Sequence, residues 1–293
     1  MLVKICGLTE EGAALAAVEA GADFLGFVFA PSRRRLEPAS ARAIIAAVRE
    51  KSGPDRVRAV GVFVDEPAER VDEVAAYCGL DYVQLNGDED PAYVRRLAMP
   101  AIVARAASAS LTSEALAAFA EAAALYLVDA YSPTERGGTG RRCDWAVAAN
   151  LAATLPIVLA GGLTPENVAA AIAAVRPCGV DVSSGVETDG RKDPAKIAAF
   201  VRRAREAEAQ LAGLPAGNLP SPYGRPTRTR TAVQSRSPLQ GGAGRPIWSA
   251  AACRRFRQQL VGQGGGKPPP AKAQASLRTP EPETGTGGTT ACC

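Results

Sequence analysis

Histidine is absent from all 293 residues of the sequence. Its absence excludes a Ser-His-Asp or Cys-His nucleophile, a metal site with histidine ligands and acid–base catalysis by an imidazole. The seven cysteines show no Cys-x-x-Cys spacing, so neither a zinc site nor a disulfide framework is indicated. Free cysteines are typical of a reducing cytosol.

Long apolar runs are also missing. No stretch approaches the roughly 18 uncharged apolar residues that a membrane-spanning helix needs. Met1 leads directly into a predicted strand instead of a signal-peptide pattern. We therefore expect a cytoplasmic protein without a membrane partner.

Charge is unevenly distributed along the chain. Residues 1–208 carry 23 Lys and Arg against 28 Asp and Glu, which gives no reason to expect a nucleic-acid partner. Residues 209–293 carry 11 basic and 2 acidic residues, and 24 of these 85 residues are Pro or Gly. This composition predicts a low-complexity, disordered basic tail. We favour a solvated extension, or an artefact at the end of the reading frame, over a nucleic-acid or membrane-surface role for Arg254, Arg255 and Arg257.

Short β-rich runs and Ala-rich amphipathic segments alternate through residues 1–208. The runs are nearly continuous in apolar residues, as in parallel strands covered on both faces. The predicted strands are Leu2–Cys6, Phe24–Phe29, Arg58–Val64, Tyr82–Leu85, Ala101–Ala106, Leu125–Asp129, Ile157–Ala160 and Val180–Ser183.

The segments between these strands begin with residues that favour helix starts, either Ser, Thr or Asp as N-caps or Pro in the first turn. The predicted helices follow Thr9, Pro38, Pro67, Asp90, Thr112, Asp144 and Thr164, and the last runs from Ala195 to about Glu208. Eight strands alternating with about eight helices predict an α/β fold, a (β/α)8 TIM barrel over residues 1–208. A doubly wound open sheet is the alternative, but it seldom uses eight units in so few residues.

In a barrel, the residues that follow the carboxyl ends of the strands line the active site. Two such turns consist of small residues, Gly161-Gly162 and Ser183-Ser184-Gly185. Successive backbone N–H groups in turns of this kind attract anions, so the last two turns of the array predict a phosphate site. The other strand ends supply Cys6, Arg33–Arg35, Asp65, Asn86, Arg105 and Asp129.

Several of these motifs together resemble the phosphoribosylanthranilate isomerase family of tryptophan biosynthesis. The resemblance spans about residues 2–205 in order. The segments that carry it are Lys4–Leu8, Gly26–Phe29 with Ser32–Arg34, Val83–Gly87, Leu127–Asp129, Gly137–Gly140 with Asp144-Trp145, Ala160–Leu163 with Pro165–Val168, and Val180–Glu187.

The resemblance implies a phosphosugar substrate and an Amadori rearrangement that needs no cofactor and no metal. It places the general base on Cys6 and the general acid on Asp129. Taken alone, Cys6 could be a small buried residue and Asp129 a helix cap or ion-pair partner. For the expected roles, a nearby cation should lower the pKa of the thiol and burial should raise that of the carboxyl.

The resemblance also implies that Arg34 holds the anthranilate carboxylate or the intermediate, with Arg35 as the alternative position. We expect the substrate to contact Arg34, Asn86, Gly161, Gly162, Ser183, Ser184 and Gly185. The loop Tyr131–Arg142 is interpreted as a lid, or otherwise as a plain connection.

Asn86 departs from the family pattern, which usually has histidine there. Asn keeps hydrogen bonding but cannot titrate, so the sequence leaves open whether activity depends on this position. Two alternatives stay open: an isomerase for a related aldosylamine of histidine biosynthesis, against which Cys6 argues, and a phosphosugar-binding barrel without catalysis. The sequence does not decide between a monomer and a homodimer.

Overall fold

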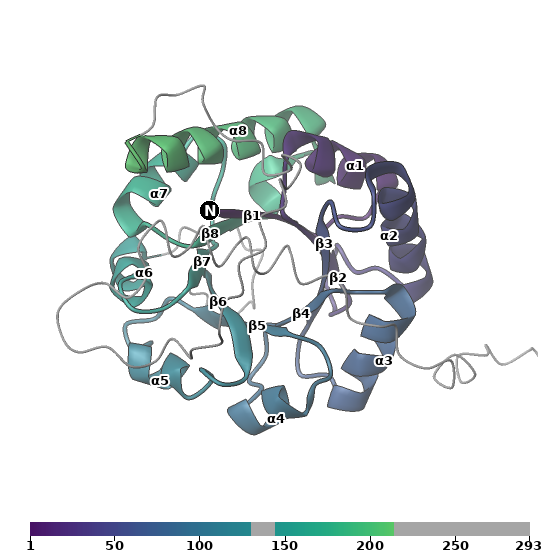
Figure 1. Ribbon diagram of the computed structural model, residues 1–293, viewed down its shortest axis with the longest axis horizontal. Helices are drawn as coiled ribbons and strands as arrows, with labels where there is room; N and C mark the ends of the chain where they lie inside the picture. Colours follow the sequence, from purple (N-terminus) through teal and green to yellow (C-terminus); the bar gives the residue numbers. More distant parts are fainter. Residues whose placement is uncertain (130–143, 214–293) are drawn as a thin grey trace, which may run out of the picture.

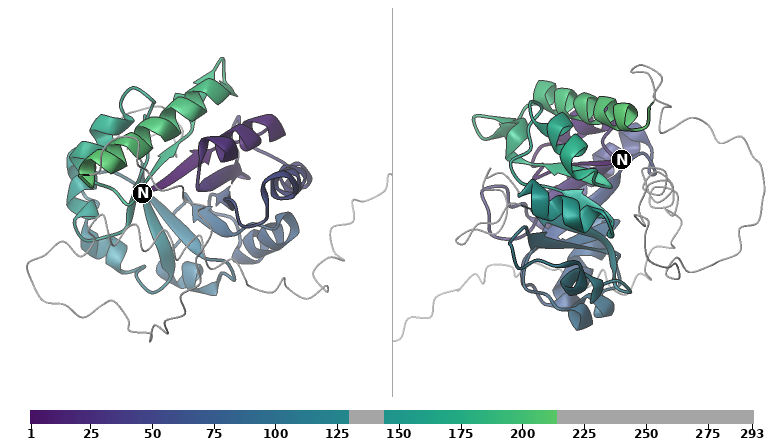
Figure 2. Two further views of the ribbon diagram at one scale, coloured as in Figure 1. Left: turned by 45° about the horizontal axis from the view of Figure 1, so that its top comes forward. Right: turned by 90° about the vertical axis from the view of Figure 1, so that its left-hand side faces the viewer.

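A computed structural model describes residues 1–129 and 144–213 of the chain. Eight parallel strands form a closed barrel in sequence order, surrounded by an outer ring of helices (Figures 1 and 2). The closed sheet confirms the predicted barrel and excludes the doubly wound alternative. The strands are β1 (Leu2–Cys6), β2 (Phe24–Val28), β3 (Arg58–Phe63), β4 (Tyr82–Leu85), β5 (Ala101–Ala106), β6 (Ala123–Asp129), β7 (Ile157–Leu159) and β8 (Gly179–Val182).

The barrel closes where β1 pairs with β8, with Leu2 opposite Gly179 and Lys4 opposite Asp181. Because side chains alternate along a strand, Leu2, Lys4 and Cys6 all point to the barrel interior. The lower interior is filled by a separate apolar cluster that includes Leu2, Phe24, Val60, Tyr82, Ile102, Leu125 and Val158. On β1, Lys4 and Cys6 follow Leu2 on the interior face and so lie above this layer, towards the carboxyl end of the strand.

The helices lie close to their predicted positions. They are α1 (Glu11–Ala20), α2 (Pro38–Ser52), α3 (Ala68–Cys78), α4 (Pro91–Arg96), α5 (Ser113–Ala117), α6 (Trp145–Ala152), α7 (Val168–Val175) and α8 (Pro194–Leu211). The side chains of Asp90, Thr112, Asp144 and Asp193 accept hydrogen bonds from the first backbone N–H groups, as expected of N-caps.

Helix α7 begins at Val168, later than the predicted start after Thr164. Thr164 donates its backbone N–H to Asn167 Oδ1 at 2.8 Å, and Thr164 Oγ1 accepts from Glu166 N at 3.2 Å. These side chains hold a separate turn ahead of the helix. Asn167 occupies the N-cap position of α7, but its side chain makes no capping hydrogen bond to the helix.

The sequence analysis did not predict a small hairpin between β8 and α8. A one-turn 3₁₀ helix, η1 (Ser184–Val186), leads into β9 (Glu187–Thr188), which pairs antiparallel with β10 (Arg191–Lys192). Asp189 and Gly190 connect the two strands with φ of 50° and 78°. An Asp-Gly pair in this conformation is typical of a tight hairpin turn.

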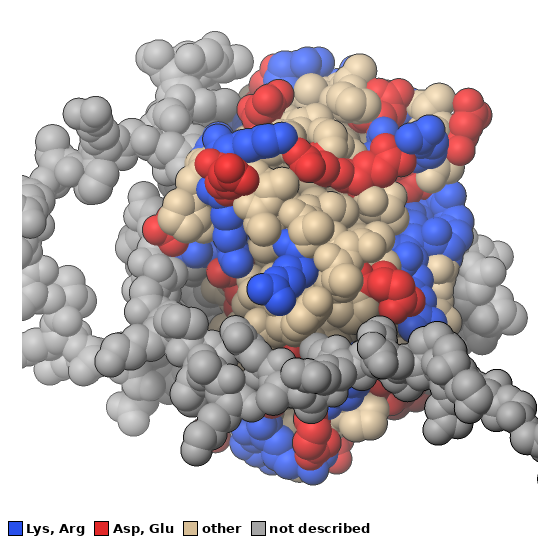
Figure 3. Space-filling view, turned by 90° about the vertical axis from the view of Figure 1, so that its right-hand side faces the viewer, with Lys and Arg blue, Asp and Glu red and all other residues tan. Residues whose placement is uncertain are grey.

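On the face drawn in Figure 3, basic and acidic side chains are intermingled among uncharged residues. Ion pairs between neighbouring elements include Lys51 with Glu11 at 2.5 Å and Arg49 with Asp81 at 3.1 Å. Within residues 1–129 and 144–213, no helix has the length and apolar character to cross a membrane. The proposed lid, Tyr131–Arg142 with Gly137, Gly138 and Gly140, and the tail from residue 214 lie outside the described residues.

Candidate active site

A cavity of about 700 Å³ opens at the carboxyl ends of the strands. All the predicted catalytic and binding residues line it, namely Cys6, Arg34, Asn86, Asp129, Gly161, Gly162, Ser183, Ser184 and Gly185. The barrel geometry thus brings together residues that are far apart in sequence. Asp65 and Arg105, which the sequence also placed at strand ends, point to the loop after β4 instead of the cavity. Asp65 accepts a hydrogen bond from Asp88 N, and Arg105 donates to the carbonyls of Gly87 and Glu89. They stabilise a neighbouring loop and are not among the described residues that line the cavity.

Cys6 and Asp129 end β1 and β6, which lie three positions apart around the ring of eight strands. Both line the cavity, with Cys6 only 7% exposed and Asp129 partly buried. A ligand lying across the cavity can therefore meet the thiol on one side and the carboxyl on the other. This placement suits a base and an acid acting on one substrate.

Charged groups surround the Cys6 thiol as the sequence analysis expected, but with a different net effect. Burial raises the pKa of the thiol above its ordinary value, while the ammonium groups of Lys4 and Lys192 lower it and the Asp181 carboxylate raises it. Burial outweighs the two cations, so the predicted lowering of the pKa of Cys6 is wrong. The thiolate is thus a minority species at neutral pH.

The β7 and β8 turns are built against one another. Gly161 and Gly162 have φ of 86° and 62°, a left-handed conformation that favours glycine. A Cβ on Gly185 would collide with the backbone carbonyl of Leu163. Asn167 Nδ2 donates to the carbonyl of Gly162 at 2.8 Å and fixes the first turn. The two turns form one surface of small residues and backbone groups, as expected of a phosphate site.

The second turn is also tied to the first strand. Ser183 Oγ donates to the carbonyl of Cys6 at 3.1 Å, and Lys192 Nζ donates to the carbonyl of Ser183 at 2.9 Å. The hairpin residue Lys192 therefore connects β10, the β8 turn and the backbone of the predicted base.

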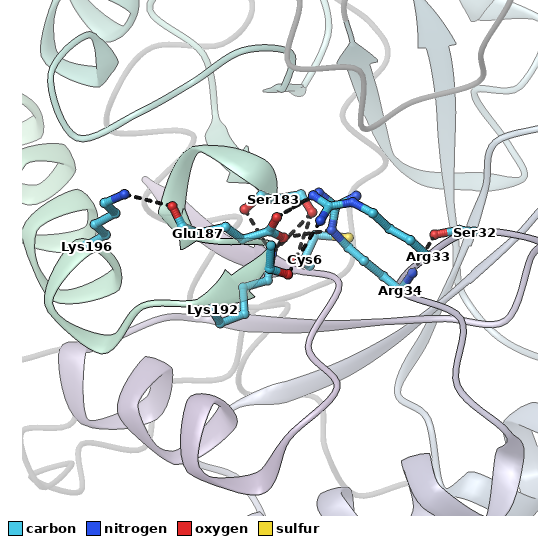
Figure 4. A network of polar contacts seen from close by, with 9 residues as sticks. Cys6, Ser32, Arg33, Arg34, Ser183, Glu187, Lys192 and Lys196 are labelled. Carbon is cyan, nitrogen blue, oxygen red and sulfur yellow. Dashed lines mark hydrogen bonds and ion pairs between the residues drawn. The ribbon is translucent and has the colours of Figure 1, made fainter.

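Arg34, and not Arg35, lines the cavity. Arg34 is 8% exposed, and its Nε and Nη2 donate to the two carboxylate oxygens of Glu187 at 2.7 and 3.1 Å. Arg33 and Lys192 also contact Glu187 (Figure 4). Arg35 is exposed and pairs with Glu37 at 3.7 Å. A bidentate pair orients Arg34 firmly and uses part of the donor set that was expected to hold the anthranilate carboxylate.

Glu187 is the hub of this cluster. Although burial raises the pKa of its carboxyl, hydrogen bonds from Arg34 and Lys192 outweigh that effect and lower the pKa to about 2. Glu187 therefore stays ionised at neutral pH and keeps its cationic partners in place. Glu187 belongs to one of the family-like motifs but had no predicted role. The Asp189-Gly190 pair is the local sequence signal from which the hairpin that carries Lys192 could have been predicted.

Gln84 is a cavity residue that the sequence analysis did not select. Its Nε2 donates to Asn86 Oδ1 at 2.8 Å, so the Gln84 amide orients the Asn86 side chain. Gln84 is 2% exposed, and its buried Oε1 has no hydrogen-bond partner in the described parts of the chain. An unsatisfied buried acceptor beside a cavity is suited to a donor on a ligand.

Comparison with known proteins places this geometry in one family. The sequence model of the N-(5'-phosphoribosyl)anthranilate isomerase family matches residues 3–203 of the chain. The N-(5'-phosphoribosyl)anthranilate isomerase of Desulforudis audaxviator is 52% identical over 206 residues, which cover 70% of this chain and 98% of that protein. The enzyme from a Roseiflexus species is 50% identical over 209 residues, covering 70% and 98%.

Solved structures agree with the sequence relatives. The crystal structure of phosphoribosyl anthranilate isomerase from Thermotoga maritima has a TM-score of 0.62 and 40% identity, covering 70% of this chain and 98% of that one. A structure of the enzyme in complex with reduced 1-(o-carboxyphenylamino)-1-deoxyribulose 5-phosphate has a TM-score of 0.58 and 38% identity, with the same coverage. The chain belongs to the N-(5'-phosphoribosyl)anthranilate isomerase family.

Proposed function

We propose that the chain converts N-(5-phosphoribosyl)anthranilate to 1-(2-carboxyphenylamino)-1-deoxyribulose 5-phosphate in L-tryptophan biosynthesis. The observation that carries this proposal is that a thiol, a carboxyl and two small-residue turns line one cavity at the carboxyl end of the barrel. Family membership supports the same reaction.

Asp129 is the proposed general acid and Cys6 the proposed general base. Asp129 gives a proton to the furanose oxygen as the bond between that oxygen and C1 breaks. The ionised Cys6 then removes the proton from C2, and the resulting enol-amine rearranges to the amino-ketose. Each transfer needs only a positioned acid or base, and each would contribute on the order of 10²–10⁴ in rate.

The β7 and β8 turns are the proposed seat of the 5-phosphate. Backbone N–H groups of the segments Gly161–Gly162 and Ser183–Gly185 are suited to an anion, and Lys192 adds a buried positive charge behind Ser183. With the phosphate held there, the reactive end of the sugar points across the cavity towards Cys6 and Asp129. A ligand carrying such a phosphate is bound by one of the related enzymes.

Arg34 and Asn86 are the proposed contacts for the rest of the substrate. Glu187 fixes the Arg34 guanidinium, and Gln84 fixes the Asn86 amide, so both groups are oriented before a ligand arrives. Pre-orientation reduces the entropy that binding must otherwise remove. The carboxylate of anthranilate is the group that a guanidinium recognises best.

Asn86 favours one second candidate function, a phosphosugar-binding barrel without catalysis. The fluorescence of phosphoribosylanthranilate, generated in the cuvette and followed with purified full-length protein, separates the two. Turnover supports the isomerase, whereas thermal stabilisation by the product analogue without any turnover would establish the binding-only alternative.

Location and assembly complete the proposal. We infer a cytoplasmic enzyme, because the amino-acid biosynthesis that it serves takes place there. The Thermotoga maritima enzyme is dimeric, and monomers have been generated from it. For this chain, monomer and homodimer both stay predictions that light scattering on the active protein distinguishes.

A further inference from the structure

A buried ion pair lies at the floor of the cavity. Lys4 is 1% exposed, and its Nζ donates to Asp181 Oδ1 at 3.0 Å. The two residues are register partners on β1 and β8, at the seam where the barrel closes. Asp181 lines the cavity, whereas Lys4 is not among the described residues that do. Lys4 therefore carries a charge into the barrel interior that the proposed reaction does not use.

Stability alone does not account for this pair. Replacing a buried ion pair by apolar residues of similar volume is often neutral or stabilising, because removing two charges from water costs more than their attraction returns. The interior residues next to Lys4 are apolar, with Leu2 two positions earlier on β1 and Phe24 as its register partner on β2. A lysine beside these apolar residues suggests that its charge acts on the cavity residues nearer the carboxyl ends of the strands.

The side chain above it is Cys6. Lys4 and Cys6 lie two residues apart on β1, so both point inward, one layer apart. Both side chains reach the space beside Gly26 on β2, where an added Cβ would lie 2.8 Å from Cys6 Sγ and 3.1 Å from Lys4 Nζ. The missing side chain of Gly26 is what allows the thiol and the ammonium to share this space.

We propose that Lys4, held by Asp181, is a positioning residue that stabilises the negative charge on Cys6 when this group acts as the base. This inference rests on the proposed function. The proton that leaves resting Cys6 goes to solvent, and the thiolate then accepts the proton from substrate C2. Lys4 keeps its own proton throughout and never touches the substrate.

Other charged groups near Cys6 must be weighed against Lys4. Asp181 on β8 opposes the thiolate, Lys192 on β10 favours it, and Asp129 on β6 lines the same cavity. Lys4 lowers the pKa of the thiol more than Asp181 raises it, and Lys192 has the smallest effect of the three. Removing the Lys4–Asp181 pair as a unit should therefore leave the thiolate less stable.

The test is the rate of Cys6 alkylation by iodoacetamide against pH, followed on the Cys6 peptide by mass spectrometry. In Lys4→Met/Asp181→Asn, both charges are removed without leaving one unpaired. We expect the apparent pKa of Cys6 to rise by about one unit or more, with an at least tenfold fall in kcat/KM at pH 7 that narrows as the pH increases. Lys51→Met, at an exposed lysine on α2, is the matched control and should change neither quantity.

Gly26→Ala provides a second route if the double variant does not fold. It keeps both charges but adds a methyl group that crowds both the thiol and the ammonium, so we expect a higher apparent pKa for Cys6 and a lower kcat with little change in KM. An unchanged Cys6 titration in the folded variants would overturn the inference. Because alkylation does not require turnover, its pH dependence measures the effect of Lys4 on Cys6 even if the wild-type protein fails to isomerise the substrate.

Discussion

At the scale of single residues, Cys6 is the proposed base, and its surroundings oppose its ionisation. Burial raises the pKa of the thiol, and Lys4 and Lys192 offset only part of that effect. A thiol kept mostly protonated avoids unwanted nucleophilic chemistry, and the small thiolate fraction remains strongly basic towards a carbon-bound proton. The pKa thus sets how activity responds to pH.

We predict that kcat/KM rises with pH through the neutral range. Below the raised pKa of Cys6, the thiolate fraction grows tenfold with each pH unit, so the logarithm of kcat/KM should climb with a slope near one. Initial rates between about pH 6 and 9 in constant-ionic-strength buffers measure this slope. A flat profile across this range would show that the ionisation of Cys6 does not limit the reaction.

The side-chain oxygen of Asn86 already accepts a hydrogen bond from its neighbour Gln84. A neutral histidine in its place can accept the same hydrogen bond on one ring nitrogen and donate from the other. We therefore expect Asn86→His to leave kcat/KM within about threefold of the wild-type value, without a new ionisation near pH 6.5. A gain of more than tenfold, titrating in that range, would mean that the position needs a positive charge.

At the scale of elements, the site depends on two turns that pack together and on a hairpin that holds them. The β7 turn contacts the β8 turn at Gly185, and the β9–β10 hairpin brings Glu187 and Lys192 back towards the cavity. The proposed phosphate seat and the Arg34 position are consequently parts of one local structure.

Gly185→Ala should separate the two turns, because the new methyl group collides with the carbonyl of Leu163. We expect KM to increase about tenfold or more with a smaller change in kcat, since the change lies at the phosphate seat and away from the reacting atoms. Gly12→Ala, on α1 with open space around its Cβ, is the matched control. An unaltered KM in the Gly185 variant, with the fold intact, would argue against the phosphate assignment.

At the scale of the whole molecule, the sequence predicted most of the barrel because each unit has local signals. Apolar runs mark the strands, and residues such as Asp90 and Asp193 mark the helix starts. The cavity residues followed from counting strands, since strand ends in a barrel meet at one face.

The remaining parts of the site depend on contacts between distant segments. Lys4 and Asp181 are 177 residues apart, and Arg34 and Glu187 are 153 apart. Neither partnership has a local sequence signal, because only closure of the barrel brings the partners together. The balance between burial and charge at Cys6 likewise depends on packing, which explains why the direction of its pKa was predicted wrongly.

The domain boundary is a prediction that belongs to this scale. Helix α8 continues to Leu211, so a protein ending at Glu208 would lose the last residues of this helix. A protein of residues 1–213 should keep kcat and KM within about twofold and the melting temperature within about 2 °C of the full chain. Loss of activity in this shortened protein would show that the tail contributes to function.

The central claim is that Cys6 and Asp129 carry out the two proton transfers on phosphoribosylanthranilate. Its most direct test is the turnover number of Cys6→Ser and Asp129→Asn, followed by anthranilate fluorescence and compared with the wild-type protein. We predict that kcat falls by at least about 10³ in each variant while circular dichroism and melting temperature stay those of a folded barrel. Near-wild-type turnover in either variant would contradict the assignment of base and acid.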